Sequence, residues 1–174
     1  MFTKQWYKAF ATQMTGGAIS DGYKAFNGTA YATSYYQNAY LYQFSPYNTM
    51  KTVLTSYNVS SPSPGVMFGT GDTPPTVDDY TLSGSLISTI SAGVSRSAGS
   101  DSEGTYCTGT YTITNTGNEE ITIKEVCLFM SLPYGNGYSR GCCCERTVLE
   151  TPVTIPAGGI GQVVYTVRVN FAIA

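Results

Sequence analysis

The chain has 174 residues, of which only 11% are charged, with a formal net charge of −2 and no histidine. This length suits one domain with a sizeable core, and the weakly acidic balance gives no basic footprint for nucleic acid. No apolar run approaches the roughly 20 residues that a membrane-spanning helix needs, and no charged-then-apolar leader opens the chain. We therefore expect a protein that is made in a cytoplasm and has neither a nucleic-acid nor a membrane partner.

Charged residues are scarce, whereas tyrosine is abundant, with 15 copies. Soluble monomers usually carry about a quarter charged residues. Because the buried parts of protein interfaces are depleted in charge, this shortage favours a surface that neighbouring copies cover. The alternative is an ordinary β protein of low charge.

The chain begins with a pattern typical of a short amphipathic helix from Phe2 to Met14. The apolar residues Phe2, Trp6, Phe10 and Met14 recur every four positions, which places them on one face of a helix. Such a face packs on the core of its own domain or inserts into a neighbouring subunit. Phe2, Trp6 and Phe10 are therefore candidate assembly residues.

A tyrosine-rich segment follows from Ala18 to Tyr57 and is poor in charge, with only Asp21, Lys24 and Lys51, and in large aliphatic side chains. Tyrosine offers a large contact area at low entropic cost and keeps a polar hydroxyl group, so it suits interfaces. The alternatives are meandering strands of the main domain and a sugar-binding surface. The tyrosines that we expect at an assembly interface are Tyr31, Tyr35, Tyr36, Tyr40 and Tyr42.

We divide the chain into an N-terminal helix with the tyrosine-rich assembly segment (1–60) and one compact β-sandwich domain (61–174). Gly65 to Gly69 is a short apolar strand. The following Gly-x-Gly is not a dinucleotide-binding loop, because Pro74-Pro75 favours an extended backbone where that loop needs a helix. Leu86 to Ile90 is a further strand candidate, and Ser95 to Glu103 resembles a flexible polar loop.

The second half of the domain alternates β-branched or aromatic residues with small or polar ones, as strands do. Tyr106 to Thr114 and Ile121 to Phe129 flank the turn Asn115 to Asn118, which predicts an antiparallel hairpin. Val148 to Ile155 is extended, and Gln162 to Phe171 is the clearest strand. The predicted fold class is all-β, an antiparallel β-sandwich or jelly-roll-like domain with one short N-terminal amphipathic helix.

The five cysteines are Cys107, Cys127 and the consecutive Cys142, Cys143 and Cys144. Neighbouring side chains of a strand point to opposite faces, so the consecutive three are poorly arranged to bind one metal ion, and we expect no metal site. If the hairpin loop spans three residues, Cys107 lies opposite Cys127, and a cross-strand disulfide is then one outcome. Buried thiols are the other.

Catalytic groups are hard to find in this sequence. General acid–base chemistry and the activation of Ser or Cys nucleophiles most often use histidine, which the chain lacks. The acidic residues fall mostly at turns, and Asp72, Asp78 and Asp79 lack the spacing of a calcium-binding loop. We predict no catalytic residue and no cofactor.

Several segments resemble, in order, a group of small virion structural proteins of tailed bacteriophages. They are the loop Gly69 to Leu82, then Ile123 to Phe129, Glu145 to Leu149, Pro152 to Gly158 and Val164 to Val167. The resemblance implies a non-enzymatic part of the virion, made in the bacterial host cytoplasm. It would assemble in symmetric copies on the capsid surface or in the tail apparatus, with identical subunits and other virion proteins as partners. The alternative is a receptor- or glycan-binding module of the adsorption apparatus, with a host surface glycan as a further partner.

One ion pair is expected within these segments. Glu125 lies near the end of one predicted strand and Arg146 near the start of another. A carboxylate and a guanidinium group form strong bidentate hydrogen bonds. We therefore expect Glu125 and Arg146 to join the two strands and to define their register.

Overall fold

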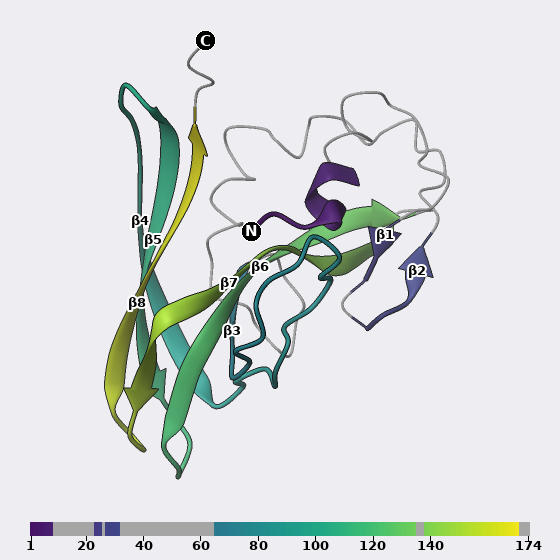
Figure 1. The fold of residues 1–174 in the computed structure, drawn as a ribbon. Helices are drawn as coiled ribbons and strands as arrows, with labels where there is room; N and C mark the ends of the chain where they lie inside the picture. The colour runs from purple at the N-terminus through teal and green to yellow at the C-terminus, as the bar shows by residue number, and fades with distance from the viewer. Residues whose placement is uncertain (9–22, 26, 32–64, 135–137, 171–174) are drawn as a thin grey trace. The chain divides into compact units, whose positions relative to one another are not determined.

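A computed structural model describes residues 1–8, 23–25, 27–31, 65–134 and 138–170 (Figure 1). The chain divides into two compact units. The first comprises Met1–Ile87 and Ile123–Pro152, and the second comprises Ser88–Thr122 and Val153–Ala174. The predicted boundary between residues 60 and 61 lies outside the described residues.

The described part of the chain is mostly β, as the sequence predicts. The strands are β1 (Tyr23–Lys24), β2 (Ala30–Tyr31), β3 (Gly65–Gly69), β4 (Ile90–Ser100), β5 (Gly104–Asn115), β6 (Ile121–Tyr134), β7 (Tyr138–Ile155) and β8 (Ile160–Asn170). They form two antiparallel three-stranded sheets, β3-β6-β7 and β4-β5-β8, and the short pair β1-β2. The predicted strands Gly65 to Gly69 and Val148 to Ile155 are confirmed.

The sheet β3-β6-β7 carries the core of the first unit. All five residues of β3 are buried, which agrees with its uninterrupted apolar sequence. The core cluster consists of Met67, Leu82, Cys127, Phe129 and Cys143, with Leu86 packed against it. Burying a side chain such as that of Met67 or Phe129 contributes about 1.5–3 kcal/mol.

The sheet β4-β5-β8 has one buried face and one exposed face. Tyr111 and Ile113 of β5 are buried together with Val163 and Tyr165 of β8, whereas Val164 between the last two is exposed. This alternation is the period-two pattern of an antiparallel sheet with one solvated side. It agrees with the alternation of apolar and polar residues that predicts a strand from Gln162 to Phe171.

The predicted hairpin between Tyr106–Thr114 and Ile121–Phe129 is wrong. β5 pairs with β4 and β8, whereas β6 pairs with β3 and β7. The turn after β5 leads into a strand of the other sheet. Asn115 favours this change of sheet because it is bound to the turn between β7 and β8. Its side-chain amide donates hydrogen bonds to the carbonyl groups of Ile155 and Pro156, and its backbone N–H donates to the Gly159 carbonyl.

Two further local predictions are wrong. Ser95 to Ser100 belong to β4 and pair with β5, although their small polar residues favoured a loop. Leu86 makes only an isolated bridge with Gly69, and the next strand begins at Ile90. Residues of an exposed strand need no apolar side chains when backbone pairing is continuous, so composition misled the assignment of Ser95 to Ser100. An apolar run such as Leu86 to Ile90 is not a strand unless its backbone finds a partner.

At the N-terminus, residues 4–8 are helical. The remainder of the helix predicted from Phe2 to Met14 lies outside the described residues. Before this turn, Phe2 bridges to Glu145 of β7, and the Thr3 N–H donates to the Cys144 carbonyl at 2.9 Å. The first residues therefore cover part of the edge of β7.

Candidate functional site

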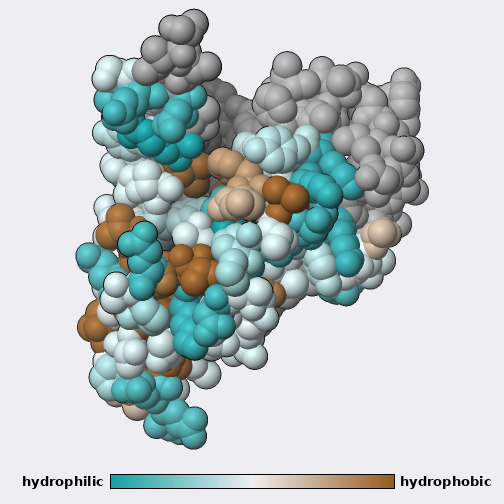
Figure 2. Space-filling view, viewed as in Figure 1, coloured by the Kyte–Doolittle hydropathy of each residue, from teal (hydrophilic) through white to brown (hydrophobic). Residues whose placement is uncertain are grey.

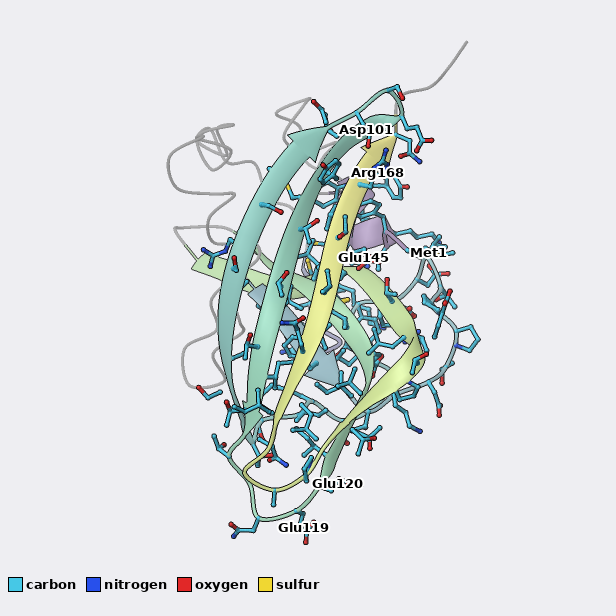
Figure 3. All side chains as sticks on the ribbon, turned by 90° about the vertical axis from the view of Figure 1, so that its left-hand side faces the viewer. Met1, Asp101, Glu119, Glu120, Glu145 and Arg168 are labelled. Atoms are coloured by element: carbon cyan, nitrogen blue, oxygen red, sulfur yellow. A yellow bond between two sulfur atoms is a disulfide. The ribbon has the colours of Figure 1, made fainter. Side chains whose placement is uncertain are left out.

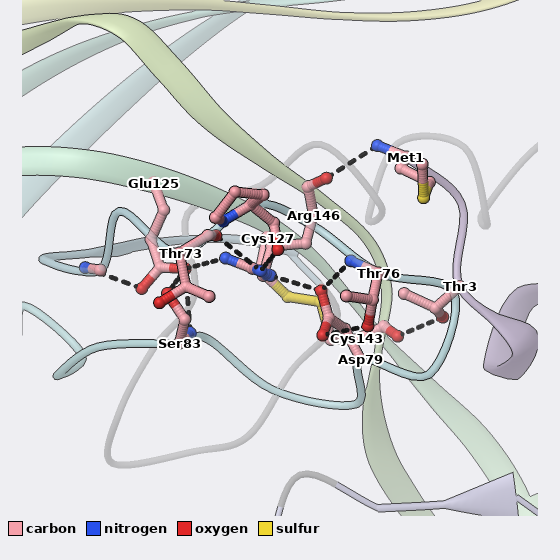
Figure 4. Close-up of polar contacts among 12 residues, drawn as sticks. Met1, Thr3, Thr73, Thr76, Asp79, Ser83, Glu125, Cys127, Cys143 and Arg146 are labelled. Carbon is pink, nitrogen blue, oxygen red and sulfur yellow. Dashed lines mark hydrogen bonds and ion pairs between the residues drawn. A yellow bond between two sulfur atoms is a disulfide. The ribbon is translucent and has the colours of Figure 1, made fainter.

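A buried polar centre lies in the first unit, around Arg146 of β7 (Figure 4). Arg146 is 1% exposed. Its Nη1 donates to Glu125 Oε2 at 2.9 Å, and its Nε donates to Asp79 Oδ2 at 2.7 Å. Its Nη2 donates to the carbonyl oxygens of Thr73 and Pro74 at 2.9 and 3.0 Å. One guanidinium group thus joins two strands to the loop between β3 and β4.

Glu125 of β6 is the second member of this centre and is 0% exposed. Its carboxylate accepts hydrogen bonds from the backbone N–H groups of Gly71, Ser83 and Gly84 at 2.8–2.9 Å, and from the Ser83 hydroxyl at 3.1 Å. Burial alone would raise the pKa of Glu125, but the N–H groups of Ser83 and Gly84 and the Arg146 guanidinium hold it below its usual value. The carboxylate is therefore ionised and fully engaged.

Asp79 is the third member and lies at the solvent side of the centre. It accepts hydrogen bonds from the Thr76 N–H and hydroxyl groups, both at 2.9 Å, as well as from Arg146. Burial opposes ionisation, yet the Thr76 N–H and the guanidinium group lower the pKa of Asp79 below its usual value. Asp79 therefore fastens the Thr76 turn to β7.

The glycines of this loop are there because the backbone approaches Glu125 closely. A Cβ atom added to Gly71 would lie 2.0 Å from Ser83 Oγ and 2.4 Å from Gly84 N. A Cβ atom on Gly84 would lie 2.3 Å from Gly71 N. Since no side chain fits between these segments, Gly71 and Gly84 allow both N–H groups to reach one carboxylate.

The exposed part of the loop is also tied to the N-terminal segment. The Lys4 N–H donates to the Val77 carbonyl at 2.6 Å, and the Lys4 ammonium group lies 2.6 Å from Asp78. The Thr3 hydroxyl donates to the Cys143 carbonyl at 2.8 Å. Residues 3–4 therefore connect the loop to β7.

A disulfide joins β6 and β7 beside the centre. It links Cys127 to Cys143, whose Cα atoms are 6.0 Å apart. The predicted alternative of a Cys107–Cys127 pair is wrong, because Cys107 lies on β5 and has a free thiol. Cys142 and Cys144 are also free and buried, with their sulfur atoms 3.6 Å apart.

The arrangement of Arg146, Glu125 and Asp79 is suited to fixing the conformation of the loop and not to proton transfer. Both carboxylates of the centre are ionised and occupied by hydrogen bonds, so neither is a free general base. Among the described residues, no group of three or more Cys, Asp or Glu side chains is placed to hold a metal ion. None of the helical structure described here is long and apolar enough to cross a membrane.

The structure locates some of the residues predicted to lie at an interface. Phe2 and Trp6 stack on each other with ring centroids 5.1 Å apart and are both half-buried. Tyr31 belongs to β2, where its backbone pairs with Tyr23. The other predicted residues, Phe10, Tyr35, Tyr36, Tyr40 and Tyr42, lie outside the described residues.

The Glu125–Arg146 ion pair expected from the sequence is present, but it is not bidentate. Only Nη1 reaches Glu125, because the other nitrogen atoms bind Asp79 and the Thr73 and Pro74 carbonyls. Sequence reasoning missed Asp79, Ser83 and Gly84 as members of the centre. The signal available was the run of closely spaced Gly, Pro and Asp residues, which marks a loop that needs an anchor.

The fold and this centre define a mostly β protein with a buried arginine that anchors a surface loop. No protein-family model matches the chain, and no curated protein or solved structure is significantly similar to it.

Proposed function

We propose that this protein is a non-enzymatic structural component of a bacteriophage virion. It assembles in symmetric copies on the capsid surface or in the tail apparatus, and its partners are identical subunits and other virion proteins. It reaches the virion after synthesis in the cytoplasm of the bacterial host.

The main support for this proposal is the structural role of the buried charged residues. The hydrogen bonds of Glu125, Asp79 and Arg146 hold the loop from Thr70 to Gly84 against the sheet. A component that works by fitting against other subunits needs surface loops of defined shape, because each flexible loop ordered on assembly costs free energy. The same residues lie in the segments that resemble phage virion proteins.

The surface chemistry also supports assembly. In the view of Figure 2, apolar residues appear as separate patches among polar and weakly polar ones. The exposed large apolar side chains include Tyr7 and Val77 of the first unit and Ile160 and Val164 of the second. Mixed surfaces of low charge are typical of specific protein interfaces.

The finer fold class belongs to the same proposal. Each three-stranded sheet has a buried apolar face, as the halves of a β-sandwich or jelly-roll-like domain do. We include in the proposal the full N-terminal amphipathic helix from Phe2 to Met14, of which residues 4–8 are helical.

Immunogold electron microscopy of purified particles tests the proposed function. Antibodies against the protein should label particles of the phage that encodes it at a repeated position. Antibodies against an unrelated cytoplasmic host protein serve as the control. Label that stays in the soluble fraction of the lysate, with none on the particles, would contradict the proposal.

A further inference from the structure

The exposed face of the sheet β4-β5-β8 presents a regular array of hydroxyl groups. On β5, the outward residues are Thr108, Thr110, Thr112 and Thr114. In the same order, the residues opposite them on β4 are Ser97, Ser95, Gly93 and Ser91, and those on β8 are Thr166, Val164, Gln162 and Ile160. We call these four rows of three residues the hydroxyl face.

Contacts within the unit show that these residues share one side of the sheet. The Thr108 and Thr166 hydroxyl groups lie 2.9 Å apart, whereas the intervening Tyr111 and Val163 are buried on the other side. The pairing of β5 with both neighbours runs without interruption over its length. Because a β-bulge would break that register, the array is continuous.

The hydroxyl face itself is uncharged. By sequence, the second unit has six charged residues. Asp101, Glu103 and Arg168 form ion pairs at one end of the sheet, and Glu119 and Glu120 lie at the other end (Figure 3). Arg96, the sixth, alternates with Ser95 and Ser97 and so belongs to the opposite side of β4.

Apolar groups project from the same surface. Val164 is 60% exposed and Ile160 is 69% exposed. The hydrogen bond between the Thr108 and Thr166 hydroxyl groups satisfies one donor, which lowers the cost of removing this pair from water. Covering Val164 and Ile160 therefore gains free energy, whereas the remaining hydroxyl groups need hydrogen-bond partners on whatever surface covers them.

We infer that a second copy of this chain covers the hydroxyl face, so that two β4-β5-β8 sheets pack face to face about a two-fold axis. A face without charge is compatible with itself, whereas a charged face would meet its own charges across such an axis. This inference deepens the proposed function and rests on it in assuming that copies of the chain assemble.

The size of the whole exposed side of the sheet is sufficient for such an interface. The hydroxyl face spans about 23 Å along the strands and forms the centre of this side, whereas the full eleven-residue strands span about 36 Å and the three strands about 14 Å in width. Beyond the hydroxyl face lies the row of Gly99, Tyr106 and Arg168, where Arg168 is paired with Asp101 and Glu103 at the rim. Packing of the whole side buries roughly 500 Å² on each copy, or roughly 1,000 Å² in total, which is the lower limit for a specific interface. A polysaccharide is the weaker occupant, because the four rows contain no aromatic ring and the Arg168 guanidinium lies over the ring of Tyr106 in the next row.

Analytical ultracentrifugation of the full chain tests this inference with two variants. Val164→Lys places a charge at the centre of the hydroxyl face. Gly93→Arg does so on β4, where a Cβ atom would meet nothing within 4 Å and the fold is not strained. The matched control is Val77→Lys, because Val77 is also exposed but lies in the first unit.

The wild-type chain and Val77→Lys should dimerise at tens of micromolar. Both face variants should weaken the dimer at least about tenfold, because each puts like charges across the two-fold axis. A monomeric wild type overturns the inference, even if that monomer binds insoluble polysaccharide. Face variants that dimerise as well as Val77→Lys overturn it too.

The same variants separate this inference from the proposed function. If particles contain the wild type and Val164→Lys in equal amounts, the hydroxyl face is not the assembly surface, although the virion role stands. If the purified chain dimerises through this face but is absent from particles, the interface stands and the virion role fails.

Discussion

Arg146 of β7 reaches Glu125 of β6 at 2.9 Å, and neither side chain is exposed to solvent. Around this pair, Asp79 and the carbonyl groups of Thr73 and Pro74 complete the binding of the guanidinium group. A buried ion pair adds little net stability compared with apolar residues, but removing one partner leaves an uncompensated charge. The pair therefore makes folding of the first unit depend on the correct placement of the loop.

Arg146→Ala should destabilise the protein by about 3–5 kcal/mol, because it leaves the Glu125 carboxylate buried without its counter-charge. Urea unfolding followed by circular dichroism measures this. The control is Lys124→Ala, which removes an exposed ion pair with Asp72. That variant should unfold at nearly the wild-type urea concentration. Equal unfolding midpoints for the two variants would show that the centre does not hold the loop.

Gly71→Ala should destabilise the protein by about 1–3 kcal/mol or prevent folding, because the new Cβ atom would overlap Ser83 Oγ and the Gly84 backbone. Gly93→Ala is the matched control, since a Cβ atom there meets nothing within 4 Å. It should change stability by less than about 0.5 kcal/mol. Thermal unfolding of both variants provides the comparison. A Gly71→Ala protein as stable as the control would mean that the loop can shift away from Glu125.

The stability of the protein should fall in acid. The pKa values of Glu125 and Asp79 are lower in the folded chain than their ordinary values of 4.5 and 3.8. A group of this kind stabilises the fold fully above its unfolded pKa, and the contribution disappears as the pH falls through its folded pKa. Urea midpoints should therefore be flat between about pH 6 and 7 and decrease below about pH 4.5.

Glu125→Gln identifies the source of that acid sensitivity. The variant should be less stable at neutral pH, because an amide cannot accept all the hydrogen bonds that the carboxylate accepts. It should also lose less stability than the wild type when the pH is lowered. An unchanged difference between pH 7 and pH 3 would assign the acid sensitivity to other carboxylates.

The cysteines should react in two groups. After unfolding without a reductant, three thiols should be titrated, those of Cys107, Cys142 and Cys144. In the folded protein Cys107 should react first, because the other two are buried. The contact with Cys142 and burial also raise the pKa of Cys144, which keeps it as an unreactive thiol. Mass spectrometry after alkylation counts them, and five reactive thiols would contradict the Cys127–Cys143 bond.

Loss of that disulfide should also affect stability. Cys127 and Cys143 close a loop with a sequence separation of 16. A cross-link of this span stabilises a protein by about 3 kcal/mol. Cys143→Ala should therefore lower the unfolding temperature markedly, whereas Cys107→Ala should change it little. Equal unfolding temperatures would show that the bond contributes nothing to the folded state.

Local patterns were sufficient for several strands. Gly65 to Gly69 is an apolar run bounded by glycines, and β8 alternates apolar and polar residues, so periodicity alone locates both. The Glu125–Arg146 pair was also within reach, because a carboxylate near the end of one predicted strand and a guanidinium group near the start of another are suited to pairing.

Local sequence patterns could not predict which strands pair with each other. The turn at Asn115 has the composition of a hairpin turn, yet the Asn115 side chain binds the carbonyl groups of Ile155 and Pro156, which lie 40 or more positions along the chain. Similarly, Ser95 to Ser100 form a strand because β5 supplies hydrogen bonds along its whole length. Such choices depend on tertiary contacts that no window of neighbouring residues contains.

The most direct test of the virion role is the number of copies per particle, measured by quantitative mass spectrometry of gradient-purified particles against their major capsid protein. The proposed role predicts a constant number that is a multiple of the symmetry of the attachment site. Less than one copy per particle, or an amount that falls with each purification step, would contradict a structural role in the virion.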